Sequence, residues 1–340
     1  MHVIPLTPSG YYPKFGAFLR CHKAMRFFAK SKTEQGWLAL LIERGAVLAV
    51  HVVRPAGGRP CVQLAASFPC EPGSEGAVLD RVAKELHVQR FRCTTMLGAG
   101  DYRLITVEAP NVPVDELKIA IRWRLKDMLD FHVDDATIDV LSIPSDTNAP
   151  VRGQSMYAVA ARNQVIQQRQ RAFEQAKIPL GVIDIPELAQ RNLAALAETE
   201  GRGLAMLTFG PDGGLLTVNH AGELCLSRRI DIAFEQLLHA DATQKAALLE
   251  RVTLELQRSL DHVERQFQFM SLSKLLIGPL GDDDAGLQEH LSANLYVPVE
   301  RFRLESVTDL ERVPALLAPE VQRQYLLAVG AGLRQEEKVL

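Results

Sequence analysis

The chain has 340 residues, 47% of them hydrophobic and 23% charged, which is an ordinary globular composition and a length that suggests two domains. The net charge of −3 argues against a globally basic nucleic-acid-binding protein, and no apolar run approaches the ~18 residues of a membrane-spanning helix. Five cysteines without a CxxC pair argue against a disulfide framework and a zinc site, as expected for a protein of the reducing cytoplasm.

Basic charge is concentrated at the N-terminus. Within residues 1–36, six lysines and arginines stand against the single acid Glu34, with aromatic residues between them. This composition predicts a basic extension that is dispensable for folding. The alternative is a contact with anionic lipid, where each basic residue near the surface contributes ~1 kcal/mol.

Residues 37–185 are predicted to form a first domain, which opens with a hairpin whose turn contains Gly45. Apolar runs between turn residues indicate strands, and apolar residues at helical spacing indicate helices. The expected strands are 37–42, 46–53, 62–68, 94–97, 102–107, 136–140, 157–161 and 180–185, and the expected helices are 77–86, 113–129 and 163–176.

The helix at 113–129 has the clearest pattern. Leu117, Ile121, Leu125, Met128 and Leu129 fall on one face, whereas Ile119 and Trp123 lie one turn apart on nearly the opposite side. On one interpretation Trp123 packs against a neighbouring helix of the same chain, because tryptophan is mostly buried in folded proteins. On the other, it belongs to a docking patch for another protein.

Residues 186–340 repeat the order of three strands followed by a helix, which predicts a second domain. We expect the boundary near Pro186, with a cleft between the two halves. The expected strands are 204–209, 215–218, 224–230, 274–277 and 297–299, and the expected helices are 187–196, 244–267, 286–294 and 319–333.

Four blocks of the sequence, 111–140 (NVPVDELKIAIRWRLKDMLDFHVDDATIDV), 156–196, 254–266 and 324–334, resemble a known family. They look like the PilM family of actin-like proteins of type IV pilus assembly, in particular its members in the MSHA (mannose-sensitive haemagglutinin) pilus system. The resemblance covers roughly residues 36–340. Chains of this family commonly begin near the equivalent of Met25, which makes Met25 an alternative start.

The resemblance implies an α/β, actin-like (actin/sugar-kinase/Hsp70 superfamily) two-domain fold. The first domain, 37–185, would carry a small inserted α+β subdomain at about 101–161, and the second would be 186–340. In actin-like ATPases two hairpins cradle the phosphates, with glycines at the turns and carboxylates that serve magnesium and water.

The chain departs from that pattern at both hairpins. The family's G-x-D-x-G reads Ala39, Leu41 and Glu43 here, and its second Asp-x-Gly reads Thr208 to Gly210. Leu41 cannot ligate a hydrated cation, and Glu43 adds negative charge where phosphate would lie. Asp212 is either a substitute carboxylate or a plain turn residue.

The resemblance thus implies a degenerate ATP site, with two plain core hairpins as the structural alternative. We expect no cofactor, at most weak binding of ATP with magnesium, no metal site and no catalytic residue. The positions of the degenerate site are Leu41, Glu43, Gly45, Thr208, Gly210, Asp212, Gly278 and Gly281.

The resemblance also implies a partner. It suggests a non-catalytic scaffold at the cytoplasmic face of the inner membrane, with peripheral membrane association and no nucleic acid. The scaffold would bind the N-terminal tail of a membrane-anchored PilN-like protein of the MshJ type, and also other platform proteins and the pilus ATPase. The groove expected in the inserted subdomain is lined by Val107, Trp123, Leu125, Leu129, Phe131 and Val133.

Two alternatives remain open at the level of sequence. The first is a working actin-like ATPase of pilus assembly, which the missing carboxylates disfavour. The second is a cytoplasmic module of a type II secretion system, which the neighbouring reading frames would distinguish.

Overall fold

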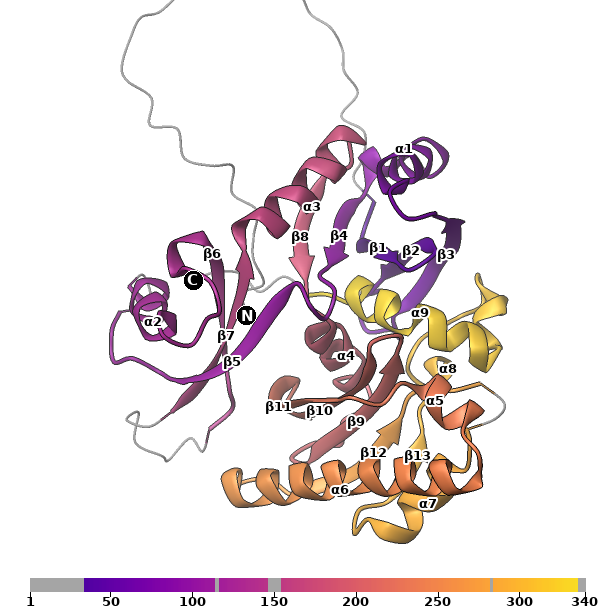
Figure 1. Ribbon diagram of the computed structural model, residues 1–340. Helices are drawn as coiled ribbons and strands as arrows, with labels where there is room; N and C mark the ends of the chain where they lie inside the picture. The colour runs from indigo at the N-terminus through magenta and orange to yellow at the C-terminus, as the bar shows by residue number, and fades with distance from the viewer. Residues whose placement is uncertain (1–33, 114–115, 146–153, 282–283, 336–340) are drawn as a thin grey trace, which may run out of the picture.

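The computed structural model describes residues 34–113, 116–145, 154–281 and 284–335 (Figure 1). Nearly all of the basic extension expected at residues 1–36 lies outside the described residues, as does the loop at 146–153. Within the described ranges, every helix is too short or too polar to serve as a membrane span.

The first half is built on a five-stranded sheet of order β3-β2-β1-β4-β8. Its first three strands are antiparallel and the last two join in parallel. The pairing of Glu43 with Ala46 leaves a turn of two residues, and Gly45 there adopts φ +86°, which side chains with a Cβ disfavour. The strands are β1 (Trp37–Glu43), β2 (Ala46–Val53), β3 (Cys61–Pro69), β4 (Arg92–Met96) and β8 (Leu180–Asp184).

Alternate residues of β1 enter two different cores, as expected for a sheet covered on both faces. Leu38 and Leu40 face outward, where the helices α1 (Glu75–Glu85) and α3 (Asn163–Gln175) cover the sheet. Ala39 and Leu41 face inward, toward the middle of the molecule.

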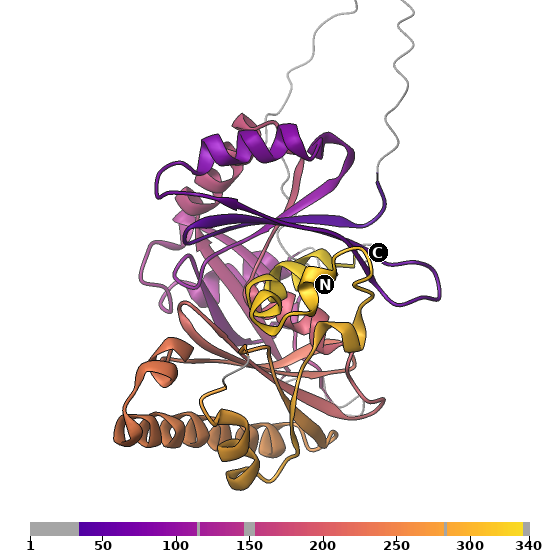
Figure 2. The ribbon, with the colours of Figure 1, turned by 90° about the vertical axis from the view of Figure 1, so that its right-hand side faces the viewer.

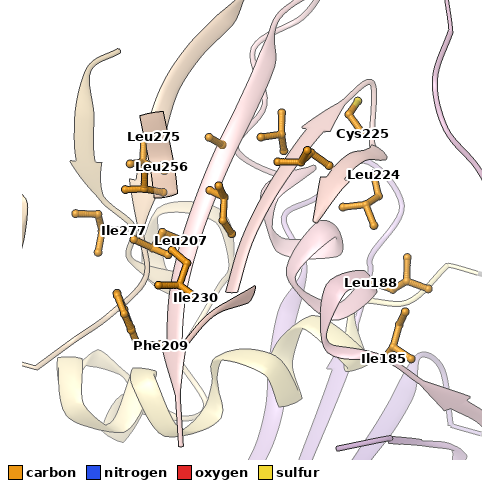
Figure 3. Close-up of a cluster of buried hydrophobic side chains, with 14 of the residues drawn as sticks. Ile185, Leu188, Leu207, Phe209, Leu224, Cys225, Ile230, Leu256, Leu275 and Ile277 are labelled. Carbon is orange, nitrogen blue, oxygen red and sulfur yellow. The ribbon is translucent and has the colours of Figure 1, made fainter. Parts of the chain in front are cut away.

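The second half repeats this plan with a sheet of order β11-β10-β9-β12-β13. Its outer face packs on α6, as Figure 3 shows for Leu256 beside Leu207 and Leu275. The elements are β9 (Gly203–Gly210), β10 (Gly213–His220), β11 (Glu223–Ile230), α5 (Phe234–His239), α6 (Ala242–Gln266), β12 (Leu272–Ile277), α7 (Leu287–Asn294), β13 (Val299–Arg301) and α8 (Leu304–Val307).

Two helices lie between the sheets, α4 (Pro186–Ala194) and α9 (Pro319–Gly332) (Figure 2). They approach so closely that a Cβ added at Gly330 would lie 2.3 Å from the Ala189 carbonyl oxygen. α9 belongs to the C-terminal half of the sequence, yet it packs on β1 and β2 of the first sheet. The last helix of the chain therefore packs on the sheet that the first strands form.

An inserted unit between β4 and α3 consists of an antiparallel sheet of order β5-β7-β6 and one helix. The helix is shorter than the sequence suggested, because it ends at Leu125 and turns follow up to residue 131. Ile121 and Leu125 are fully buried against the sheet. The elements are β5 (Tyr102–Glu108), α2 (Leu117–Leu125), β6 (Ala136–Ser142) and β7 (Ser155–Arg162), and short 3₁₀ turns occur at Val88–Arg90, Val133–Asp135 and Pro314–Leu317.

Candidate functional site

A cavity of about 270 Å³ lies between the two halves, at the tips of the first hairpin of each sheet. Leu41, Glu43 and Arg44 line it from the β1–β2 hairpin, and Thr208 and residues 210–213 line it from the β9–β10 hairpin. The fold therefore brings together positions that are some 170 residues apart in sequence. The volume is slightly below the ~300–1,000 Å³ of usual small-molecule pockets.

Leu41 and Thr208, the positions compared above with the carboxylates of actin-like ATPases, are core residues. Leu41 is 1% exposed and packs in the same cluster as residues of α9. Thr208 is buried and donates its hydroxyl to Oε1 of Gln190 on α4 at 2.6 Å, while the amide of Gln190 donates to the Met206 carbonyl at 2.7 Å. Leu41 has no lone pair and the Thr208 hydroxyl is already engaged, so neither offers a ligand to a magnesium shell.

Glu43 and Asp212 are the carboxylates that remain at the predicted positions. Glu43 is partly buried at the end of β1, and burial raises the pKa of its carboxyl to about 7. Asp212 accepts a hydrogen bond from Nη2 of Arg44 at 3.0 Å, which links the turns of the two hairpins across the cavity. The residues present therefore do not match the magnesium-nucleotide pattern, since one carboxylate is hard to ionise and the other already has a cation.

Gly278 and Gly281 line a separate small cavity of about 100 Å³, next to the ends of β12 and β13. The two cavities are adjacent, because a Cβ at Gly278 would lie 2.9 Å from the Thr208 methyl group. No group of three or more potential metal ligands occurs in the described part of the chain.

A network that sequence reasoning missed joins three parts of the molecule at the wall of the cavity, which Arg229 lines. Tyr102 of β5 donates its hydroxyl to Glu187 of α4, and Arg229 of β11 donates to the Tyr102 oxygen at 2.6 Å and to Oε1 of Glu187 at 3.0 Å. Glu187 is 1% exposed. Burial, together with the neighbouring Glu187 carboxylate, raises the pKa of Tyr102 well above its usual value. The three residues are 42 to 127 positions apart, and no local pattern pairs them.

The expected groove of the inserted unit is corrected by the structure. Val107, Leu125 and Val133 are buried, so they cannot line an open groove. Leu129 and Phe131 are partly buried, and the guanidinium of Arg162 lies 4.2 Å from the centroid of the Phe131 ring.

Trp123 is 71% exposed, which excludes the interpretation that it packs on a neighbouring helix. Ile119 is 61% exposed and Met128 51% exposed, and they lie on the same helix and the turn after it. We call Ile119 and Trp123, which lie one helical turn apart on α2, the α2 patch. An exposed cluster of large apolar side chains is typical of an interaction surface.

Comparison with known proteins gives a fold but no close relative. No family model matches the chain, and no curated protein matches it. A solved PilM–PilN type IV pilus biogenesis complex contains a chain that superposes with a TM-score of 0.68 at 22% identity, over 88% of this chain and 98% of that one. A protein of Bacteroides thetaiotaomicron with an actin-like ATPase fold and unknown function gives 0.50 at 10% identity, over 86% and 99%.

The chain has an actin-like fold. The cytoplasmic domain of EpsL, an inner membrane component of the type II secretion system of Vibrio cholerae, also aligns, with a TM-score of 0.44 at 14% identity over 71% of this chain and 80% of that one. The two repeated sheets and the cavity at their hairpin tips are the architecture that this fold class predicts.

Proposed function

We propose that this chain is a PilM-like scaffold of a type IV pilus assembly platform, located in the cytoplasm at the inner face of the inner membrane. The observation that carries the proposal is the likeness to the PilM–PilN complex over 98% of that chain. The sequence blocks at 111–140 and 156–196 favour the MSHA-type system, in which the chain would be the MshI protein. Its partner would then be the membrane-anchored PilN-like protein of the MshJ type.

The scaffold is proposed to be non-catalytic, with a degenerate nucleotide site. Leu41 and the engaged hydroxyl of Thr208 support this proposal, since charge-assisted contacts worth about 1.5–3 kcal/mol each have no donor or acceptor here. Calorimetric titration with ATP and magnesium tests it directly. A dissociation constant in the low micromolar range would instead favour a working ATPase, and Asp212 would be the first residue to substitute.

The tail of the PilN-like partner is proposed to dock on the α2 patch. The patch combines a tryptophan, a residue type enriched among interface hot spots, with an isoleucine one helical turn away, both of them exposed. The partly buried side chains of Leu129 and Phe131 are proposed as further contacts. Other platform proteins and the pilus ATPase would bind elsewhere on the scaffold.

Pull-down of the chain by the immobilised N-terminal tail of the PilN-like protein tests the docking proposal. Trp123→Ala should lower the affinity by about thirtyfold, the ~2 kcal/mol of a hot-spot aromatic. Tyr296→Ala is the matched control, because Tyr296 is 52% exposed on the second half. Equal binding by both variants would place the tail elsewhere, and no binding by the unmodified chain would contradict the function itself.

A further inference from the structure

Besides the apolar packing of α9 on β1 and β2, polar contacts join the halves of this actin-like fold at several places. At the front of the cavity, the Arg44–Asp212 pair joins the two hairpin turns. At the back, the Tyr102–Glu187–Arg229 network joins the inserted unit, α4 and β11. At the far end of α9, Arg334 pairs with the buried carboxylate of Asp184 at 3.1 Å.

The back contact is the most extensive of the three. Besides the network, Tyr157 of β7 donates its hydroxyl to the carbonyl of Cys225 on β11 at 3.1 Å. Tyr102, Tyr157 and Val159 of the inserted sheet share one hydrophobic cluster with Leu224 and Leu226 of β11. The insert, which belongs to the first half of the sequence, therefore packs directly on the edge strand of the second sheet.

These contacts differ in solvent exposure and therefore in the free energy needed to break them. Arg44 and Asp212 are 81% and 45% exposed, and solvent-exposed ion pairs contribute little and are screened by salt. The side chain of Glu187 is 2% exposed and that of Arg229 is 37% exposed, and the second carboxylate oxygen of Glu187 accepts from Tyr102. Opening the halves would leave Glu187 and Arg229 paired on the second half but would separate both from the buried Tyr102 hydroxyl, and a buried hydroxyl without its partners costs more than a broken exposed ion pair.

We propose that the Tyr102–Glu187–Arg229 network is a built-in clamp, which keeps the two halves of the molecule closed without a bound nucleotide. In this fold the ligand between the halves would otherwise have to bridge the two hairpins. Here Arg44 joins the two hairpin turns through Asp212, and Tyr102 of the first half bonds to Glu187 and Arg229 of the second. The inference rests on these contacts and on the filled carboxylate positions, and it does not depend on which partner the chain binds.

The closure can be measured as a distance between the halves. Spin labels attached through a ketone-bearing amino acid at Asp80 of α1 and Glu255 of α6, both exposed, leave the native cysteines untouched. The full chain should give a single narrow distance distribution, unchanged by millimolar ATP with magnesium. Arg229→Ala should broaden the distribution and shift it to longer distances.

Two further variants make the test specific. Arg228→Ala is the matched control, since the neighbouring Arg228 is exposed and donates only a long hydrogen bond of 3.5 Å to the Ser227 carbonyl. It should leave the distribution unchanged. Tyr102→Phe removes one hydroxyl and keeps the buried ring, so it should broaden the distribution even if Arg229→Ala fails to fold.

The proposal is overturned by either of two results. One is a shift of the unmodified chain on addition of ATP with magnesium, which would show that a nucleotide controls closure. The other is a distribution of Tyr102→Phe that matches the unmodified chain. Partner binding is measured separately by the tail pull-down, so failure of the clamp and failure of the proposed function give different results.

Discussion

At the scale of single residues, Leu41 and Thr208 are core positions beside the cavity between the halves. Leu41 packs with residues of α9, and the hydroxyl of Thr208 bonds to Gln190 on α4. An apolar side chain and an internally bonded hydroxyl stabilise the fold at places where a carboxylate would need solvent or a cation. A carboxylate introduced at either position should therefore be costly.

Leu41→Asp is expected to destabilise the protein by about 3 kcal/mol or more, because it places a carboxylate at a position that is 1% exposed. Urea unfolding followed by circular dichroism measures the loss. Leu41→Met is the control and should cost less than ~1.5 kcal/mol, since it keeps volume and polarity. A stable Leu41→Asp variant that binds ATP would contradict this prediction, because it would show that position 41 accepts a carboxylate.

Glu43 gives a pH dependence whose sign follows from its raised pKa. Burial raises the pKa in the folded chain from 4.5 to about 7, so the folded state holds the proton where the unfolded state has lost it. Below pH 4.5 the Glu43 carboxyl is protonated in both the folded and the unfolded chain, and its full contribution to folding stability is present. This contribution is lost as the pH rises through about 7, because the buried carboxyl then has to ionise.

Glu43→Gln should therefore be more stable than the unmodified chain above about pH 7, by ~1–2 kcal/mol, and the difference should vanish near pH 4.5. Urea unfolding of both chains across this range measures it. A constant difference at all pH values would mean that Glu43 titrates normally in the folded protein.

At the scale of elements, α2 has two faces with different roles. Its inner face carries Ile121 and Leu125, both fully buried, and its outer face carries Ile119 and Trp123. The helical period separated these faces in the sequence, except that Met128, expected on the inner face, is 51% exposed in the turn after α2. The fate of the outer face depended on whether any other element would cover it, and in the described structure α2 contacts chiefly β6.

A pair of substitutions distinguishes the two faces. Leu125→Ala should cost ~2–5 kcal/mol of unfolding free energy, because it leaves a cavity under the helix. Trp123→Ala should change the stability by no more than ~0.5 kcal/mol, because its side chain is 71% exposed. Thermal melts of both variants provide the measurement, and a large loss in Trp123→Ala would show that the residue is packed in solution.

At the scale of the whole molecule, the C-terminal end of the chain contacts the first half. α9 packs on the first sheet, and Arg334 just beyond it meets Asp184 at the end of β8. The side chains are 11% and 1% exposed, so this pair is a buried one that spans 150 positions of sequence. Buried pairs contribute little against an apolar substitute, but breaking one is costly.

Arg334→Met is therefore expected to lower the unfolding free energy by about 3–5 kcal/mol, because the buried Asp184 loses its cation and keeps the hydrogen bond from the Ile185 N–H. Arg258→Met is the control, since Arg258 and Glu255 form an exposed pair on α6 that should be worth no more than ~0.5 kcal/mol. Denaturant unfolding measures both. An equal effect of the two substitutions would show that the buried pair is not maintained in solution.

The sequence by itself determined most of the elements and the repeated plan of the two halves. Hairpins such as β1–β2, with Gly45 in its turn, and long helices such as α6 follow from local periodicity and turn chemistry, which depend on residues close together in the chain. The departures at Leu41 and Thr208 were also visible, because a motif position can be compared without knowing its surroundings. Local patterns thus gave the elements, and the resemblance of sequence blocks to a known family gave the fold class and the expectation of a degenerate nucleotide site.

Only the tertiary structure decided which polar side chains form hydrogen bonds or ion pairs and which apolar side chains are exposed. The hydroxyl of Thr208 bonds to Gln190 and Arg44 pairs with Asp212. Glu187 and Arg229 of the second half pair with each other and both bond to Tyr102 of the first. The exposure of Trp123 and the burial of Val107 were decided in the same way. Such outcomes depend on which surfaces meet in space, and neither helical nor strand periodicity contains that information.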